Sequence, residues 1–442
     1  MIGRQPVSVI EYAMDRAAEL GWEAKGTTSP NPPVGAVIID ADGRIVGQGH
    51  TQPAGGPHAE VMAVRNAGDA TAGATAVVTL EPCAHTGRTG PCTDVLLSAG
   101  ISTVVYAVPD PNPIAHGGHE VLAEEGITVI GGFHATEVRR GALRSWLQRV
   151  ATGRAMVTLK VAATLDGRVA APDGTSQWIT SVEARHFVHR DRATRDALIV
   201  GTGTVIADNP RLTARKPDGT LYAHQPDHVI TGSRPISEEA KIFAHARSQR
   251  FDTHDLSHVI QELTHQGYVD LLIEGGPTLA SAALDQGVVD HIHWYVAPSI
   301  LGSGLPAIQV PHVSTLTDRR DFTIEDITRL GPEEAKIFAH ARSQRFDTHD
   351  LSHVIQELTH QGYVDLLIEG GPTLASAALD QGVVDHIHWY VAPSILGSGL
   401  PAIQVPHVST LTDRRDFTIE DITRLGPDLL IDAHRQAESS PE

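Results

Sequence analysis

The sequence predicts an α/β protein with more than one domain. Its 442 residues are enough for two or three domains that each bury a core. Hydrophobic residues make up 41% of the chain and charged residues 20%, as in globular proteins. Apolar runs short enough for strands alternate with apolar residues at helical spacing through both halves, and this alternation is typical of layered α/β domains.

The first domain is expected over residues 1–150, as an α/β/α layer structure. Apolar residues at helical spacing between Ile10 and Leu20 predict a first helix. The turn sequence at 40–43 predicts a hairpin between two strands. The same patterns predict strands at 34–39, 44–49, 75–80, 103–108 and 127–130, and helices that begin after Pro57, at Cys92 and at His119 and over 137–150.

The second domain is expected to begin at residue 155, because an apolar strand at 156–161 restarts the pattern. A further strand at 197–200 leads into a glycine-rich turn at 201–204, where the backbone could approach a ligand closely. This turn is not the dinucleotide-binding fingerprint, because Ile206 stands where the third glycine would be. An ordinary tight turn is the alternative.

A second glycine-rich turn is a candidate phosphate site. It lies at 274–278, between a strand at 269–273 and a helix that starts at 279. Glycines that expose the backbone, followed by a proline and a helix N-terminus, allow amide groups and the helix dipole to meet a phosphate. A plain turn is the alternative to this interpretation.

The last third of the chain contains a tandem repeat, because residues 238–332 recur letter for letter as residues 333–427. The sequence leaves open whether this repeat is a recent event, engineered, or an error in the gene prediction. Each copy holds seven histidines, so fourteen of the 25 histidines are one set counted twice. We interpret these histidines as surface or packing residues.

The two copies cannot both take the same position in one domain. A mostly parallel sheet has one place for the strand at 269–273, so its twin at 364–368 must lie elsewhere. We expect the first copy to build the nucleotide site, and the second to form an incomplete lobe or to pair with a neighbouring chain. Residues 428–432 are expected to close the sheet beside 417–422. The expected segments after the first domain are 155–332, 333–427 and 428–442.

The segment from Pro57 to Cys92 carries a candidate catalytic metal site. It contains His58 and the only two cysteines of the chain, Cys83 and Cys92. One imidazole and two thiolates suit zinc, and because structural zinc sites use four protein ligands, three leave a position for water. Glu60 stands where zinc deaminases place a carboxylate that transfers protons without binding the metal. The alternative is one buried thiol, one surface thiol and a surface histidine.

Charge and cysteine usage indicate the class of partner and the compartment. The formal net charge of −19 repels phosphate backbones and argues against a nucleic-acid partner. No run approaches the ~18 apolar residues of a membrane span, so no membrane partner is expected. Two reduced cysteines that bind zinc fit the cytoplasm better than a disulfide does. We therefore expect a cytoplasmic protein that acts on a small molecule. A homo-oligomer is expected as well.

The chain resembles the bifunctional riboflavin-biosynthesis deaminase-reductase family over both halves. In the first half the resemblance rests on the metal residues and on the eight residues between the cysteines, where cytidine and tRNA-adenosine deaminases usually have two. In the second half it rests on Thr-Leu-Asp-Gly at 164–167, Ser-Gln-Trp-Ile-Thr at 176–180 and Glu-Gly-Gly-Pro-Thr at 274–278. The resemblance implies a cytidine-deaminase-like α/β/α domain followed by a dihydrofolate-reductase-like α/β domain.

The resemblance also implies the residues of both sites. Zinc would be bound by His58, Cys83 and Cys92, with Glu60 as the proton shuttle. Lys160 is our candidate for polarising the sugar end of the reductase substrate. NADPH contacts are implied for Ala162, Trp178, Thr204, Asp208, Gly276, Pro277, Thr278, Leu279, Ala280, Ser281 and Ala282. Substrate contacts are implied for Asn31, His85, Arg88, Ser176, Arg192, Leu212, Arg215 and Glu274, of which Arg192 and Arg215 suit a ribose phosphate.

The chain departs from the family at Thr51, where a histidine is usual, and at Gly90, where a proline is usual. The implied function is zinc-dependent deamination of 2,5-diamino-6-(5-phosphoribosylamino)pyrimidin-4-one, followed by NADPH-dependent reduction of the ribosyl chain to ribityl. One alternative is a zinc nucleoside or tRNA deaminase with a non-catalytic C-terminal binding domain, which would consume no NADPH. Another is a zinc-stabilised assembly protein whose repeat is an interaction module, which an open metal position would argue against.

Overall fold

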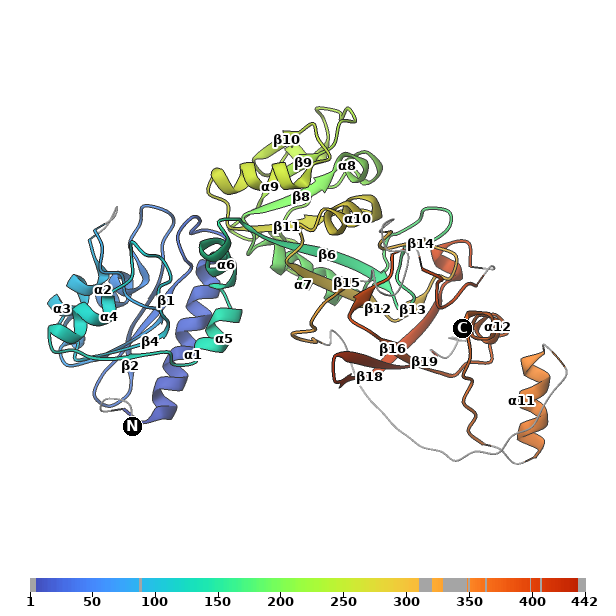
Figure 1. Ribbon diagram of the computed structural model, residues 1–442, viewed down its shortest axis with the longest axis horizontal. Coiled ribbons are helices and arrows are strands. Elements are labelled where there is room, and N and C mark those ends of the chain that lie inside the picture. Colours follow the sequence, from blue (N-terminus) through green and yellow to red (C-terminus); the bar gives the residue numbers. More distant parts are fainter. Residues whose placement is uncertain are drawn as a thin grey trace. The chain divides into compact units, whose positions relative to one another are not determined.

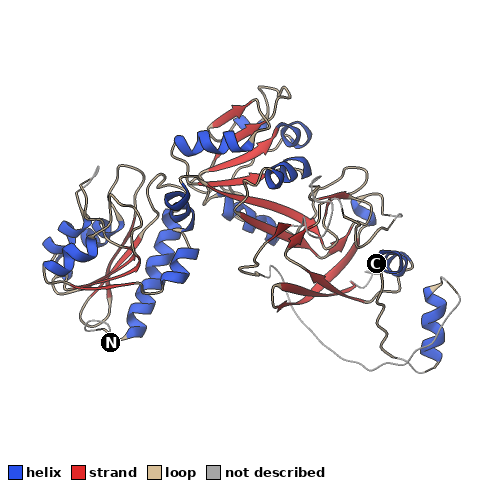
Figure 2. Cartoon of the chain, in the orientation of Figure 1, coloured by secondary structure: helices blue, strands red, loops and turns tan. Residues whose placement is uncertain are grey.

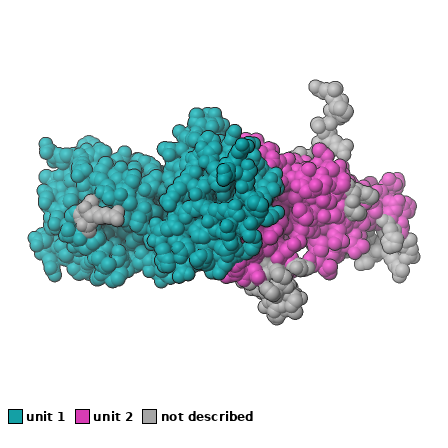
Figure 3. All heavy atoms as spheres, turned by 90° about the horizontal axis from the view of Figure 1, so that it is seen from above, with its two compact units in different colours: residues 1–158, 189–273, 289–291 teal, residues 159–188, 274–288, 292–442 magenta. Residues whose placement is uncertain are grey.

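The computed structural model describes residues 5–86, 90–309, 320–328, 348, 350–361, 364–397, 399–405 and 408–435. The chain divides into two compact units (Figure 3). Both units combine helices with strands, which confirms the α/β class (Figure 2). No described helix is both long and apolar enough to cross a membrane. Unit 1 comprises residues 1–158, 189–273 and 289–291, and unit 2 comprises residues 159–188, 274–288 and 292–442.

Unit 1 contains a five-stranded sheet with strand order β2-β1-β3-β4-β5. β1 runs antiparallel to β2 and β3, whereas β3, β4 and β5 are parallel. Helices α2, α3 and α4 lie on one face of this sheet and α1, α5 and α6 on the other, as expected for α/β/α layers (Figure 1). The strands are β1 (Gly35–Ile39), β2 (Ile45–His50), β3 (Thr75–Leu80), β4 (Thr103–Val108) and β5 (Thr128–Gly131). The helices are α1 (Val7–Ala24), α2 (Ala59–Ala67), η1 (Gly68–Thr71), α3 (Cys92–Ser98), α4 (Gly118–Glu124), α5 (Ala135–Arg140) and α6 (Arg144–Thr152).

The predicted hairpin of β1 and β2 positions the helix that follows the histidine motif. A Cβ on Gly49 would lie 2.4 Å from Met62 Cβ, and a Cβ on Gly47 would lie 2.3 Å from Ala63 O. Because these two positions of β2 lack side chains, α2 packs directly against the strand. Helix α2, which begins directly after His58, therefore lies in close contact with β2.

One predicted helix is wrong in its extent. The single helix expected over 137–150 is observed as α5 and α6, which are separated at Gly141. Gly141 is the C-cap of α5 and has φ −84° and ψ −142°, outside the helical region. Glycine costs about 1 kcal/mol relative to alanine inside a helix, so the chain breaks there even though apolar residues continue at helical spacing.

The second sheet has six strands in the order β10-β9-β8-β11-β6-β12. Its strands β10, β9, β8 and β11 are parallel neighbours. The turn expected at 201–204 is observed as the end of β8 and the start of α8, and the phosphate turn leads into α10. The strands are β6 (Met156–Thr164), β8 (Ala197–Gly201), β9 (Asp227–Thr231), β10 (Ser248–Phe251), β11 (Asp270–Glu274) and β12 (His291–Ala297). The helices are α7 (Val182–Arg192), α8 (Thr202–Asp208), η2 (Lys241–Phe243), α9 (Leu256–His265) and α10 (Pro277–Asp285).

Unit 2 also contains a four-stranded sheet in which both copies of the repeat take part. Its order is β13-β18-β19-β16, so the first copy contributes β13 and the second contributes β16 and β18. β18 and β19 form an antiparallel hairpin through Gly426. Only the second copy is followed by the sequence of β19, which explains why its segment, and not the twin in the first copy, forms this hairpin. The remaining elements are β7 (Arg168–Ala170), β13 (Ser299–Ile300), β14 (Leu305–Pro306), β15 (Arg320–Asp321), α11 (Leu351–His360), α12 (Pro372–Asp380), β16 (His386–Val391), β17 (Ser394–Ile395), η4 (Leu411–Asp413), β18 (Arg415–Leu425) and β19 (Asp428–Arg435).

The two copies have the same sequence but different environments. Helix α9 buries five residues against unit 1, whereas α11, with the same ten residues, buries none. The first copy forms β11, but residues 365–369 of the second form no strand. Val269 is 3% exposed and its twin Val364 is 98% exposed. The sheet position is filled once, as the sequence predicts.

This contrast provides a matched test of stability. We expect Leu272→Ala to lower the free energy of unfolding by about 2–5 kcal/mol, because it leaves a cavity in a fully buried strand. Leu367→Ala, the same change in the second copy, should alter it by less than about 0.5 kcal/mol, since Leu367 is 80% exposed. Urea denaturation followed by circular dichroism measures both. Equal losses for the two variants would contradict the observed placement of the copies.

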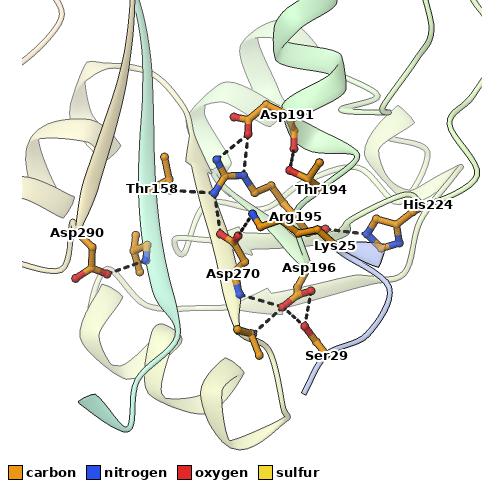
Figure 4. A network of polar contacts seen from close by, with 12 residues as sticks. Lys25, Ser29, Thr158, Asp191, Thr194, Arg195, Asp196, His224, Asp270 and Asp290 are labelled. Carbon is orange, nitrogen blue, oxygen red and sulfur yellow. Dashed lines mark hydrogen bonds and ion pairs between the residues drawn. The ribbon is translucent and has the colours of Figure 1, made fainter. Parts of the chain in front are cut away.

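A buried polar network joins the first domain to the parallel strands within unit 1 (Figure 4). Lys25 follows α1, and its Nζ forms an ion pair with Asp270 Oδ2 on β11. Arg195 Nη1 donates to Asp270 Oδ1 at 2.7 Å and to Thr158 Oγ1 at 2.9 Å, and Arg195 Nη2 donates to Asp191 Oδ1 at 2.7 Å. The side chains of Lys25, Asp270 and Arg195 are all less than 8% exposed.

A second carboxylate extends this network. Asp196 accepts hydrogen bonds from Ser29 Oγ at 2.8 Å, from Val269 N at 2.7 Å and from Asp270 N at 2.9 Å (Figure 4). Ser29 belongs to the loop before β1, whereas Val269 and Asp270 lead into β11. Lys25 and Ser29, which both belong to the loop between α1 and β1, thus link the first domain to the same buried strand.

Candidate active sites

The three predicted metal ligands lie together in unit 1. His58 is the N-cap of α2, Cys83 follows β3, and Cys92 is the first residue of α3 after Pro91. His58 Nδ1 is 3.3 Å from Cys92 Sγ and 3.6 Å from Cys83 Sγ. One ligand atom from each of these three residues lies within 4.8 Å of the others. Two helix starts and a loop therefore converge on one point.

The electrostatics of this cluster fit a cation. A hydrogen bond from Cys92 lowers the pKa of Cys83 to about 4, so one thiolate forms readily. The hydrogen bond to Cys83, together with burial, raises the pKa of Cys92, because two adjacent buried thiolates repel each other. A divalent metal ion removes this conflict by compensating both negative charges, and two sulfur atoms with one imidazole nitrogen are donors that zinc prefers.

Glu60 lies beside the cluster in the first turn of α2 and is only 4% exposed. Burial, followed by the negative charge of Cys83, raises the pKa of Glu60 to about 7. A carboxyl group with this pKa exchanges protons readily near neutral pH, as a general acid and base must.

Glu81, which the sequence analysis missed, holds the loops around the site. Its carboxylate accepts backbone hydrogen bonds from Asp110 N at 3.1 Å, His119 N at 3.0 Å and Gly117 N at 3.3 Å. It lies two residues before Cys83 and is 7% exposed. The only sequence signal for it is that a carboxylate directly follows the buried strand β3.

The predicted substrate residues of the first domain lie in different environments. Asn31 is half-buried in the loop before β1, and its N–H donates to Thr28 O at 2.9 Å. His85 lies two residues after the first cysteine, and its buried Nδ1 has no hydrogen-bond partner among the described residues. Arg88 lies outside the described residues. Thr51, which stands where the family has histidine, is buried, and its Oγ1 accepts from Val34 N at 3.1 Å.

Several predicted reductase residues lie together in unit 1. Arg192 Nη1 donates to Thr213 O at 3.2 Å, and Arg215 Nη2 is 3.2 Å from His189 Nε2. His189 Nδ1 is in turn 2.9 Å from Thr213 O. His189, which the sequence analysis missed, therefore links the two predicted arginines. The other predicted residues of this unit are Thr204 and Asp208 on α8, and Leu212 in the loop beyond it.

The remaining predicted reductase residues lie in unit 2. Trp178 is 61% exposed, and the guanidinium carbon of Arg185 lies 4.7 Å from the centre of its ring. Lys160 Nζ lies 5.9 Å from the centre of the Tyr295 ring. Gly276 is the N-cap of the nine-residue helix α10, so no capping side chain covers the amide groups of its first turn. Unit 2 also contains Ala162 on β6, Ser176, Glu274, and residues 277–282 of α10.

The geometry agrees with two family matches. Residues 7–108 match the cytidine and deoxycytidylate deaminase zinc-binding region. Residues 155–336 and 315–431 match the RibD C-terminal domain, so the second match includes the whole second copy of the repeat. The chain thus contains a zinc-dependent deaminase domain and an NADPH-dependent reductase domain.

Curated relatives match both domains. The riboflavin biosynthesis protein RibD of Mycobacterium tuberculosis is 48% identical over 330 residues, which are 74% of this chain and 97% of that protein. RibD of Corynebacterium ammoniagenes is 50% identical over 309 residues, 70% of this chain and 91% of that protein. RibD of Escherichia coli K12 is 39% identical over 360 residues, 73% of this chain and 97% of that protein.

Solved structures agree with these relatives. A diaminohydroxyphosphoribosylaminopyrimidine deaminase/5-amino-6-(5-phosphoribosylamino)uracil reductase from Thermotoga maritima has a TM-score of 0.60 and 27% identity, covering 97% of this chain and 99% of that one. RibD of Acinetobacter baumannii has a TM-score of 0.58 and 28% identity, covering 98% of this chain and 100% of that one. The chain contains both family domains and a His-Cys-Cys cluster of the zinc type, and it matches its curated relatives over nearly their whole length. This chain therefore belongs to the RibD family of bifunctional riboflavin biosynthesis enzymes.

Proposed function

We propose that the chain removes the 2-amino group of 2,5-diamino-6-(5-phosphoribosylamino)pyrimidin-4-one by hydrolysis and then reduces the ribosyl chain of the product to ribityl. The observation that carries the first step is the cluster of His58, Cys83 and Cys92 beside the buried Glu60. The name of the Thermotoga maritima relative, which describes both activities, supports the pair of reactions.

In the deamination, His58, Cys83 and Cys92 would hold zinc. When bound, zinc supplies a Lewis acid that makes water reactive at neutral pH. Glu60 takes the proton of the attacking water and delivers it to the departing ammonia. Its pKa of about 7 suits both transfers, because the protonated and ionised forms are then similar in energy near neutral pH. The hydrogen bonds to Glu81 keep the loops around the site in place.

In the reduction, NADPH supplies a hydride when it is bound, and the protein positions the two reactants. The N-terminus of α10, which begins after Gly276, is suited to a phosphate of the nucleotide. Arg192 and Arg215 are suited to the ribose phosphate of the substrate, because guanidinium groups bind phosphate oxygens in pairs. Lys160 remains our candidate for polarising the sugar carbon that accepts the hydride.

The deciding experiment offers pure protein the diaminopyrimidine phosphate with and without NADPH. We expect ammonia release in both cases, and NADPH consumption only after deamination has produced the second substrate. Ammonia release from nucleosides or tRNA without NADPH consumption would instead support a deaminase with a non-catalytic C-terminal domain.

The two copies of the nucleotide turn allow a further prediction. We expect Gly276→Asp to weaken NADPH binding roughly tenfold or more, because a carboxylate at the start of α10 repels a phosphate there. Gly371→Asp, at the start of α12, should leave the affinity unchanged, since α12 does not follow a strand of the parallel sheet. Fluorescence titration of NADPH measures both affinities. Equal weakening, or an effect of Gly371→Asp alone, would assign the site to the second copy.

The proposal also covers the kind of partner that the chain binds and the compartment in which it acts. The substrate is a small molecule, as in the relatives that the chain matches. The homo-oligomeric state and the cytoplasmic location stay predictions of the sequence, and size-exclusion chromatography with light scattering tests the first of them.

A further inference from the structure

A cluster of histidines and carboxylates lies on one face of the four-stranded sheet in unit 2. β19 pairs with β16 on one side, with His386 opposite His434 and His388 opposite Asp432. It pairs with β18 on the other side, where the register shifts between Ile419 and Asp421. Glu420 is the extra residue of this bulge, and bulges commonly redirect a side chain. Intervening residues of these strands, including Ile387, Ile431 and Ala433, pack into a hydrophobic core.

The distances within this cluster approach those between the ligands of one metal ion. One ligand atom each from His386, Glu420 and Asp432 lies within 4.8 Å of the others. Two ligands bound tetrahedrally to the same zinc ion are about 3.4 Å apart, so small side-chain movements would bring all three into contact with one ion. His386 Nδ1 is already 3.9 Å from Glu420 Oε2.

The surroundings of the cluster favour a bound cation. The side chains of Glu420 and Asp432 are only 13% and 19% exposed, so two carboxylates share a region with little water. Asp432 Oδ1 lies 3.5 Å from His388 Nε2 and accepts no hydrogen bond from the residues that the structure describes. Two carboxylates with oxygens within 4.8 Å of each other repel, and a divalent ion between them would compensate both charges. His434 Nδ1 lies 2.8 Å from Glu420 Oε1, so this histidine also borders the cluster.

We infer that His386, Glu420 and Asp432 form a second divalent-metal site, separate from the cysteine-containing site of the deaminase domain. One imidazole and two carboxylates suit Zn²⁺, with water at the remaining position. The site arises from the repeat, because Asp432 and His434 occur once and β19 pairs with the second copy. The twins of the second-copy ligands, His291 and Glu325, belong to no such group among the described residues.

The test uses the full chain and Zn²⁺ alone as the probe. The protein is dialysed against increasing free Zn²⁺, and the bound metal is counted by mass spectrometry. We expect two zinc ions per chain: a tight one at the cysteine site, and a weaker one that Glu420→Gln and His386→Gln each weaken at least tenfold while the tight ion remains. Glu325→Gln, which changes the same sequence in the first copy, should keep both ions.

Each outcome decides the inference. Binding of a single zinc ion by the unaltered chain would overturn it, as would a second ion that survives in both Glu420→Gln and His386→Gln. Loss of the second ion in Glu325→Gln would place the site in the first copy and would also overturn it. The two variants lie on different strands, so a folding defect in one leaves the other as a test. Circular dichroism detects such a defect. His386 is the more exposed of the two residues, so its replacement is the less disruptive one.

Discussion

Replacement of Glu60 by glutamine is expected to lower the rate of deamination by about 10²–10⁴-fold while the metal stays bound. Glutamine keeps the size of the side chain but cannot take up and release a proton. The ligand atoms of His58, Cys83 and Cys92 remain in place, so metal analysis should still find zinc at this site. Ammonia release from the diaminopyrimidine phosphate measures the rate.

Two controls separate the role of Glu60 from a general defect. Reduction should proceed in Glu60→Gln when the deaminated intermediate and NADPH are supplied, because the reductase residues lie in another domain. Glu124→Gln, which changes an exposed carboxylate, should leave deamination intact. Loss of zinc from Glu60→Gln would show that Glu60 is a metal ligand, and loss of both activities would argue for one shared site.

Asp270→Asn is expected to lower the free energy of unfolding by about 3–5 kcal/mol, because it leaves the buried charges of Lys25 and Arg195 without their shared carboxylate. Burial acts to raise the pKa of Asp270, but the charges of Arg195 and Lys25 outweigh it and hold that pKa below its usual range. The stabilisation is therefore present above the ordinary pKa of an aspartate and is lost as the pH falls through the lower, folded value. Urea denaturation at neutral pH measures the difference.

The repeat supplies the matched control for this change. Asp365 has the same neighbours in sequence but is exposed, so Asp365→Asn should alter the free energy of unfolding by less than about 0.5 kcal/mol. A small effect of Asp270→Asn, equal to that of Asp365→Asn, would show that the ion pairs with Lys25 and Arg195 do not hold the first domain to β11.

The metal cluster could be predicted because its signals are local. His58 and Cys92 stand at helix starts that proline and apolar spacing mark, and the structure brings them to Cys83. Glu81 could not be predicted in the same way. Its three backbone partners lie 29 to 38 residues away and meet it only after the connection between β4 and α4 folds around its carboxylate.

The expected strands and helices of the first domain also followed from apolar periodicity, with the break at Gly141 as the exception, whereas β9, β10, β12, α7 and α9 were not predicted. Periodicity reports which face of an element is apolar, and it continues across one glycine. Whether the helix continues depends on the backbone conformation of that glycine. This conformation is decided by how α5 and α6 pack on the sheet.

By itself the sequence determined the α/β class, the local metal motif and the existence of two identical copies. Only the tertiary structure decided which copy is buried, because Val269 and Val364 have the same neighbours in sequence and differ only in the contacts available to them. The same holds for Lys25 and Asp270, which are 245 residues apart in the sequence and meet only in the folded unit. Each position in the folded core can be filled by one segment only. Local sequence patterns are the same in both copies, so they cannot predict which copy fills it.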